Sequence, residues 1–171
     1  TSATDTFNTA VGYSAGEQIT TGVQNTLIGG LAGDAITTGV QNVATGTYAL
    51  GANTTGGQNV AIGRAALESN TTASNNTAVG NHALLSNTTG TSNTAVGAFA
   101  ADANTTGVNN TALGLHAYTA GATASGNTAL GSNAMTGVVT GDNNTAVGLL
   151  ALGANTTGAN NTALGMTSLT S

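Results

Sequence analysis

The chain has 171 residues and a formal net charge of −5, with one Lys or Arg and six Asp or Glu residues. A single cation argues against nucleic-acid binding, which needs several phosphate-neutralising side chains. The chain contains no Cys, so a cysteine nucleophile is excluded. Only 4% of its residues are charged and it has no Pro, whereas disordered low-complexity chains are normally rich in one or the other. We therefore expect a folded chain with a thin core that needs partner chains.

An Asn recurs every 17 residues, and a Gly follows each Asn four residues later. The Asn residues are Asn8, Asn25, Asn42, Asn59, Asn76, Asn93, Asn110, Asn127, Asn144 and Asn161. A constant period without insertions keeps successive coils in register. It therefore predicts an all-β, parallel β-solenoid of about ten coils, forming one repeat domain over residues 1–171. Neither end carries a polar capping segment, so we interpret the chain as a fragment of a longer fibre.

The first part of each coil predicts a strand with an inner and an outer face. Counting the Asn as position 1, position 3 is Ala in nine of ten coils, and position 4 is Val, Ile or Leu except at Thr45. Strand alternation sends position 3 inward and positions 2 and 4 outward, and a full-length row of outward apolar residues marks an interface. The predicted homo-oligomer interface consists of Val11, Ile28, Ile62, Val79, Val96, Leu113, Leu130, Val147 and Leu164.

The middle of the coil predicts an exposed turn followed by a return strand. Position 5 is always Gly, which suits a backbone with positive φ or a close approach of neighbouring coils. Position 8, Ala in all coils but one, is expected to point inward. Positions 6, 7, 9 and 10 vary most, so we expect them at the surface. An aromatic and basic strip there is the best candidate for a ligand contact: Arg64, His82, Phe99, His116 and Tyr118.

The end of the coil predicts a second turn. Position 14 is Thr in every coil, usually followed by Gly, and Thr beside Gly suits a turn closed by a side-chain-to-backbone hydrogen bond. The expected coil is therefore strand, turn, strand, turn. The position 1 Asn side chains are expected to stack amide on amide along the rod.

The string NVAIG at 59–63, with NTAVG and NTALG elsewhere, resembles the repeat in head domains of trimeric autotransporter adhesins. Similar arrays occur in tail-fibre-like proteins of phages and prophages. The resemblance covers the whole chain and implies a left-handed β-roll in a homotrimer, with Val60 and Ile62 facing the threefold axis and Ala61 the chain's own core. It also implies an extracellular place on a cell surface or virion fibre, with a host-cell receptor, glycan or matrix as partner. Thr replaces Val at position 2 in eight of ten coils, which makes this interface more polar.

The chain offers no arrangement typical of an enzyme. His82 and His116 share position 7 but lie two coils apart, about 9.6 Å, which is too far for one metal ion. The acids do not form a Gly-Asp calcium repeat, and no Ser, His and Asp fall into a plausible triad. We therefore expect no catalytic residue, metal or cofactor. No apolar run predicts membrane insertion either.

Two further interpretations concern the polar residues. Nine N-x-S/T sequons arise from the repeated NTT and NNT strings, and we expect their Asn side chains to be engaged in turns rather than glycosylated. Thr at positions 2 and 14 leaves an ice-binding β-solenoid as the alternative function. A flat ice-binding face, however, wants two outward Thr at i and i+2, whereas positions 13 and 14 are adjacent and should point opposite ways. A structural or adhesive fibre segment is therefore the favoured prediction.

Overall fold

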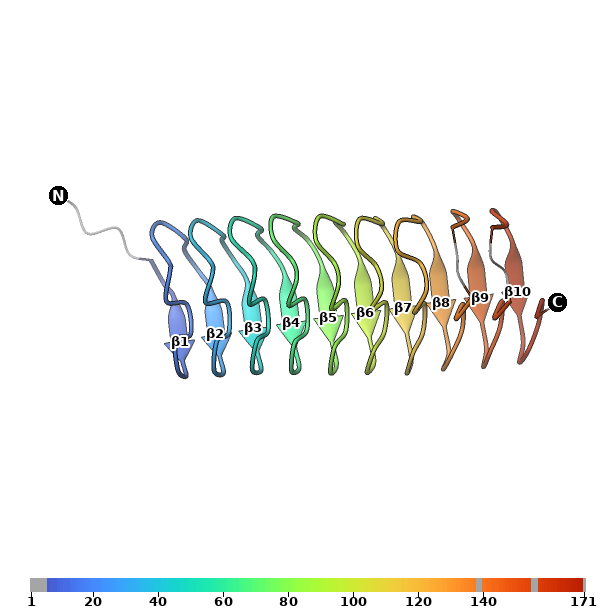
Figure 1. The fold of residues 1–171 in the computed structure, drawn as a ribbon, viewed down its shortest axis with the longest axis horizontal. Coiled ribbons are helices and arrows are strands. Elements are labelled where there is room, and N and C mark those ends of the chain that lie inside the picture. The colour runs from blue at the N-terminus through green and yellow to red at the C-terminus, as the bar shows by residue number, and fades with distance from the viewer. Residues whose placement is uncertain (1–5, 138–139, 155–156, 171) are drawn as a thin grey trace.

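A computed structural model describes residues 6–137, 140–154 and 157–170. Each coil contributes one short strand, and the ten strands form a single parallel sheet in chain order (Figure 1). The strands are β1 (Thr9–Val11), β2 (Thr26–Ile28), β3 (Val43–Thr45), β4 (Val60–Ile62), β5 (Thr77–Val79), β6 (Thr94–Val96), β7 (Thr111–Leu113), β8 (Thr128–Leu130), β9 (Thr145–Val147) and β10 (Thr162–Leu164). The described residues contain no helix. The predicted all-β solenoid is confirmed.

The strands pair without any shift of register. Every residue lies beside the residue 17 positions further along, as with Ala61 and Ala78 in β4 and β5. The result is a straight rod with β1 and β10 at opposite ends (Figure 1). Coils are numbered here from the one that begins at Asn8.

The predicted second strand is wrong, because the described residues of each coil hold only one. The return segment instead contains residues at positive φ, at positions 7 and 9, such as Tyr48 (62°) and Leu50 (54°). This conformation is costly for side chains with a Cβ. Hydrogen bonds to the adjacent coils offset the cost, since the Tyr48 N–H donates to Gly30 O and the Leu50 N–H to Ala66 O.

The position 5 glycines meet both demands expected of them. Gly63 has φ +135°, and a Cβ built on it would lie 2.4 Å from Gly80 O in the next coil. Any side chain would therefore force the coils apart at this turn.

The core is a narrow column of small residues. Beyond the first coil, Ala at positions 3 and 8 is buried, as in Ala61 and Ala66, which confirms the inward assignment of both positions. Position 9 was expected at the surface, and that prediction is wrong, because Leu50, Leu67 and Leu84 are fully buried. Their positive φ turns them inward to fill the space between the Ala rows.

The predicted Asn ladder at position 1 is confirmed along the whole rod. From Asn25 to Asn161, each backbone N–H donates to the side-chain oxygen of the Asn one coil earlier, at 2.8–3.0 Å. In most coils the Nδ2 of the same Asn donates to the position 15 carbonyl, as from Asn76 to Gly90 O (2.9 Å). The ladder therefore joins coils to one another and also closes each coil on itself.

A second ladder lies at position 12 of coils 3 to 6. Asn70 Nδ2 donates to Asn53 Oδ1 (2.9 Å), Asn87 Nδ2 to Asn70 Oδ1 (3.0 Å) and Asn104 Nδ2 to Asn87 Oδ1 (2.8 Å). All four side chains are buried. The NTT strings at a 17-residue spacing were the signal for this ladder, although we had interpreted them only as turns.

Candidate functional site

The outer side of the ten-stranded sheet is a surface that repeats along the rod. We call the position 2 and position 4 side chains of β1–β10 the sheet face. The predicted interface residues all lie on it: Val11, Ile28, Ile62, Leu113, Leu130 and Leu164 are exposed, and Val79, Val96 and Val147 are half-buried. An exposed Ile or Leu on one strand after another is unusual for a surface that stays in water.

The sheet face carries no charged residue. Four of the acids, Glu17, Asp34, Glu68 and Asp102, share position 10, and Asp142 lies at position 16. A like-charged copy can therefore approach this face without bringing acids into contact. Only Thr at position 2 and Thr45 at position 4 interrupt its aliphatic character.

Four of the five predicted contact residues lie together at the turn that follows the strands. We call Arg64, His82, Phe99 and His116 the turn strip; they come from coils 4 to 7 in succession. Arg64 Nη1 lies 2.6 Å from His82 Nε2. The His82 and Phe99 ring centroids are 5.1 Å apart at 60°, and those of Phe99 and His116 are 5.0 Å apart at 10°.

Asp102 lies beside the turn strip, and one of its carboxylate oxygens lacks a hydrogen bond. Its Oδ1 is buried and has no hydrogen-bond partner. Burial raises the pKa of the Asp102 carboxyl, while the nearby His116 and, more weakly, His82 act in the opposite direction. The two imidazoles thus share a single acidic neighbour.

The fifth predicted contact residue, Tyr118, is not at the surface, so that prediction is wrong. Its side chain is fully buried at position 9. Its hydroxyl donates to Ala124 O (3.1 Å) and accepts from Asn127 Nδ2 (3.2 Å). A Cβ on Gly121 would clash with the Tyr118 ring, so the hydroxyl takes the place that the position 12 Asn amide holds in coils 3 to 6. The Tyr and Gly pair at positions 9 and 12 was the sequence signal for this exchange.

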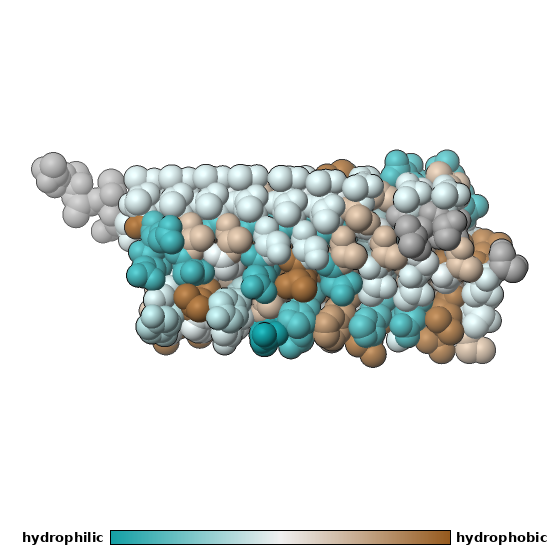
Figure 2. Space-filling model, viewed as in Figure 1, coloured by the Kyte–Doolittle hydropathy of each residue, from teal (hydrophilic) through white to brown (hydrophobic). Residues whose placement is uncertain are grey.

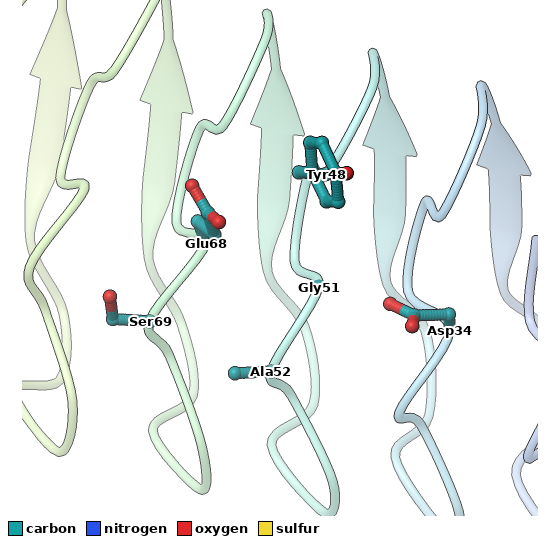
Figure 3. A pocket seen from close by; sticks show the side chains of 6 residues that line it. All are labelled: Asp34, Tyr48, Gly51, Ala52, Glu68 and Ser69. Carbon is teal, nitrogen blue, oxygen red and sulfur yellow. The ribbon is translucent and has the colours of Figure 1, made fainter.

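A shallow hollow of about 310 Å³ lies at position 10 of coil 3. Gly51 has no side chain there, and Asp34 and Glu68 lie on either side of the gap, with the Tyr48 ring nearby (Figure 3). Burial raises the pKa of Asp34, and the charge of Glu17 adds to the rise. Sequence reasoning missed this hollow, although the Gly between two acids at a 17-residue spacing marks it.

The opposite edge of the rod is formed by the turn that precedes the strands. The Thr side chains at position 14 are exposed in every coil from Thr21 to Thr157. In coils 1 to 6 the hydroxyl bonds belong instead to position 13, where Thr54 Oγ1 donates to Thr71 O of the next coil (3.1 Å). The predicted position 14 turn bond is therefore misplaced by one residue. Figure 2 shows a straight, pale row along this upper edge, whereas strongly polar and apolar residues gather along the lower edge.

The structure separates the sequons into two groups. Asn53, Asn70, Asn87 and Asn104 are buried in the position 12 ladder. Asn75, Asn109, Asn143 and Asn160, at position 17, are exposed. Asn155 lies outside the described residues. The expected engagement in turns thus holds only for the first group.

Two features are absent from the described residues. No three His, Cys, Asp or Glu side chains gather closely enough to hold a metal ion. No helix in the same residues is long and apolar enough to cross a membrane.

Comparisons with protein-family models, with curated proteins and with solved structures found no match to the chain.

Proposed function

We propose that this chain is a non-enzymatic segment of an extended fibre, such as a surface adhesin or a phage-type tail fibre, and that it assembles as a homotrimer through the sheet face. The observation that carries the proposal is the outward row of aliphatic residues at position 4 of nine of the ten strands, from Val11 to Leu164. Burying this row against partner chains supplies the apolar contact that the narrow Ala core lacks. The resemblance to adhesin heads supports three copies rather than two.

A second copy of the chain fits the sheet face better than an unrelated partner. The face repeats one step ten times, at the strand spacing of about 4.8 Å. A surface with the same step matches it over its full length, and the chain itself provides that surface. The absence of charge on the face means that no complementary charge is required.

Light scattering after size exclusion tests the assembly. Wild type should show three times the chain mass, and Val96→Asp should lose it, because a charge would be buried against its symmetry mates. Thr106→Asp adds the same charge in the same coil but on the exposed opposite edge, and should keep the trimer. A wild-type chain that is folded and stable as a monomer would contradict the proposal.

Val96→Asp could also unfold the chain, so a milder variant is needed. Thr45 shows that position 4 accepts Thr within the same strand geometry. Val79→Thr with Val96→Thr should leave each coil intact and weaken only the association. An unchanged trimer dissociation constant in this variant would place the interface elsewhere.

One observation favours ice binding as a second candidate function. The exposed position 14 Thr side chains form a straight row with a regular spacing (Figure 2). The position 13 hydroxyls donate to backbone carbonyls, as at Thr54, so this edge offers a single row of exposed Thr side chains. Thermal hysteresis at micromolar protein that is lost in Thr72→Lys with Thr89→Lys would establish this function over adhesion.

A further inference from the structure

The turn strip combines features found nowhere else on the described rod. It contains Arg64, the only Lys or Arg of the chain, and both of its His residues. The ring spacings of 5.0 and 5.1 Å match the spacing of about 4.8 Å between coils, so the rings follow one another along the rod axis, with Phe99 and His116 stacked and His82 edge-on to Phe99. The Phe99 and His116 rings therefore cover one another's faces. Their edges, which carry partial positive charge and the imidazole N–H groups, remain for solvent.

The contact between Arg64 and His82 limits the charge of the strip. A guanidinium has donors only, so Arg64 Nη1 donates and His82 Nε2 accepts. This geometry requires a neutral imidazole with its proton on Nδ1. If His82 gains a proton, it loses that lone pair and becomes a second cation beside Arg64. The contact then breaks, and the guanidinium is released toward solvent.

The charged groups around the imidazoles are few. Arg64 contacts His82, and Asp102 attracts both His116 and His82. Asp102 Oδ1 is buried without a partner, so this oxygen is withdrawn from a ligand outside the rod. Glu68 lies in the same coil as Arg64 but at position 10, on the rim of the hollow around Gly51.

We propose that the turn strip binds the carboxylate or sulfate groups of an acidic polysaccharide lying along the rod, and that it does so when His82 and His116 are protonated. Arg64, His82 and His116 then present three cations in a row, with gaps of one and two coils. A chain with one charge per sugar or per disaccharide matches those gaps. Nucleic acid is disfavoured, because binding it needs several permanent phosphate-neutralising cations and the chain has one Lys or Arg. This inference does not require the trimer, since the strip lies at the turn and not on the sheet face.

Binding of immobilised polygalacturonate and dextran sulfate to the full chain tests the proposal, with neutral dextran as the ligand control. Imidazoles in general gain charge over the range from about pH 8 to about pH 5. Both polyanions should bind at the lower pH and bind at least about tenfold more weakly at the higher pH, because charge-assisted hydrogen bonds are lost. Binding of one polyanion alone would identify the anionic group that the strip takes. Equal binding at both pH values, or equal binding to neutral dextran, would overturn the proposal.

The matched variants use residues that the repeat already places at these positions. Ser132 and Asn133 occupy positions 6 and 7 of coil 8, and Asn133 (φ 53°) shares the positive φ of the position 7 residues His82 (57°) and His116 (52°). Arg64→Ser with His82→Asn and His116→Asn should therefore keep the fold and abolish pH-dependent binding. Leu149→Ser with Leu150→Asn makes comparable changes in coil 9 and should leave binding unchanged.

Circular dichroism and the oligomer mass are measured on the same samples. Persistent binding by the folded triple variant would show that the strip is not the site. Loss of binding by the triple variant with an unchanged trimer would support the turn strip as the binding site. A wild-type chain that is monomeric and still binds would contradict only the proposed trimer.

Discussion

Coils 1 and 2 fill their interior differently from coils 3 to 6, although the backbone repeats without change. In the first two coils position 9 is Gly and position 12 is Ile, and Leu27 replaces the usual inward Ala. A Cβ on Gly33 would lie 2.7 Å from Ile36 Cδ1 and 2.9 Å from Leu27 Cδ2, so these apolar side chains occupy the space above the glycine. In coils 3 to 5 Leu occupies position 9, and buried Asn occupies position 12.

The comparison shows that the interior residues at positions 9 and 12 change together, in both volume and polarity, while the position 1 ladder stays the same. Ile36 needs no hydrogen bond, and Gly33 makes room for it. The Asn53 amide needs both an acceptor and a donor. Its Nδ2 donates to Gly56 O (3.0 Å), and its Oδ1 accepts from Asn70 Nδ2 (2.9 Å). The backbone is the same in both regions, because the ladder from Asn8 to Asn161 holds the coils together whether the interior is apolar or contains Asn.

The largest expected effect follows from breaking that shared ladder. Asn76→Ala leaves the Asn93 N–H without its acceptor and removes one of the two side-chain amides that donate to Gly90 O, the other being that of Asn87. One buried unpaired N–H at about 1–3 kcal/mol and one lost hydrogen bond at about 1 kcal/mol predict a loss of about 2–4 kcal/mol in the free energy of unfolding. Asn25→Ala removes the corresponding bonds in the other region, where Ile36 offers Gly39 O no second amide donor, and should cost at least as much. Denaturant titration of both variants would reveal a clear difference if the two regions depended on the ladder unequally.

The next effect tests whether the interior is exchanged as a set. Gly33→Leu alone should overpack the core and cost about 1–3 kcal/mol in stability. Ile36→Asn alone should bury an amide beside a void, and Leu27→Ala alone should leave a cavity. The triple variant copies Ala44, Leu50 and Asn53 of coil 3 and extends the Asn ladder by one step. Its loss of stability should be smaller than the sum of the three single losses by more than about 1 kcal/mol.

Additive losses in that series would mean that each position acts alone. A control series at the surface, Gln24→Ala with Gln41→Ala, should be close to neutral. These two exposed side chains share only one hydrogen bond, Gln41 Nε2 to Gln24 Oε1 (3.1 Å).

The sequence predicted what depends on the period and missed what depends on the path of the backbone within a coil. The inward Ala61, the outward Ile62 and the Asn59 ladder step all follow from strand alternation and stacking. Position 9 was misplaced because positive φ at Leu67 reverses the direction that a strand would give its side chain. Neither Leu nor Tyr is a residue type that indicates a left-handed backbone conformation.

Coil 7 fills its interior in a third way, with Tyr118 at position 9 and Gly121 at position 12. Removing the Tyr118 hydroxyl measures how much its hydrogen bonds contribute to the stability of the chain. Tyr118→Phe removes one of two donors to Ala124 O, which also accepts from Asn110 Nδ2 (2.8 Å), and weakens the bonding of Asn127 Nδ2, which also reaches Ser125 O (3.4 Å). Because two hydrogen bonds are lost and each contributes about 0.5–1.5 kcal/mol, we expect a loss of about 1–3 kcal/mol in the free energy of unfolding. Tyr48→Phe removes a hydroxyl from a ring that is 40% exposed and should change stability little. Equal effects of the two variants would show that the buried hydroxyl does not substitute for the position 12 Asn.

The smallest expected effect comes from coil 6, where Ala101 replaces Leu at position 9 and Asp102 follows it. Because burial raises the pKa of Asp102 above 3.8, the folded chain holds this proton more tightly than the unfolded chain does. The contribution of Asp102 to stability therefore rises as the pH falls through its folded-state pKa toward 3.8, and its ionised form costs stability at neutral pH. Asp102→Asn should raise the melting temperature slightly at pH 7 and reduce the gain in stability seen on acidification. Glu17→Gln removes the same charge from an exposed position and should not reproduce that change. If Asp102→Asn instead lowers the melting temperature at pH 7, then attraction from His116 and His82 outweighs burial, and the carboxylate stabilises this coil in its charged form.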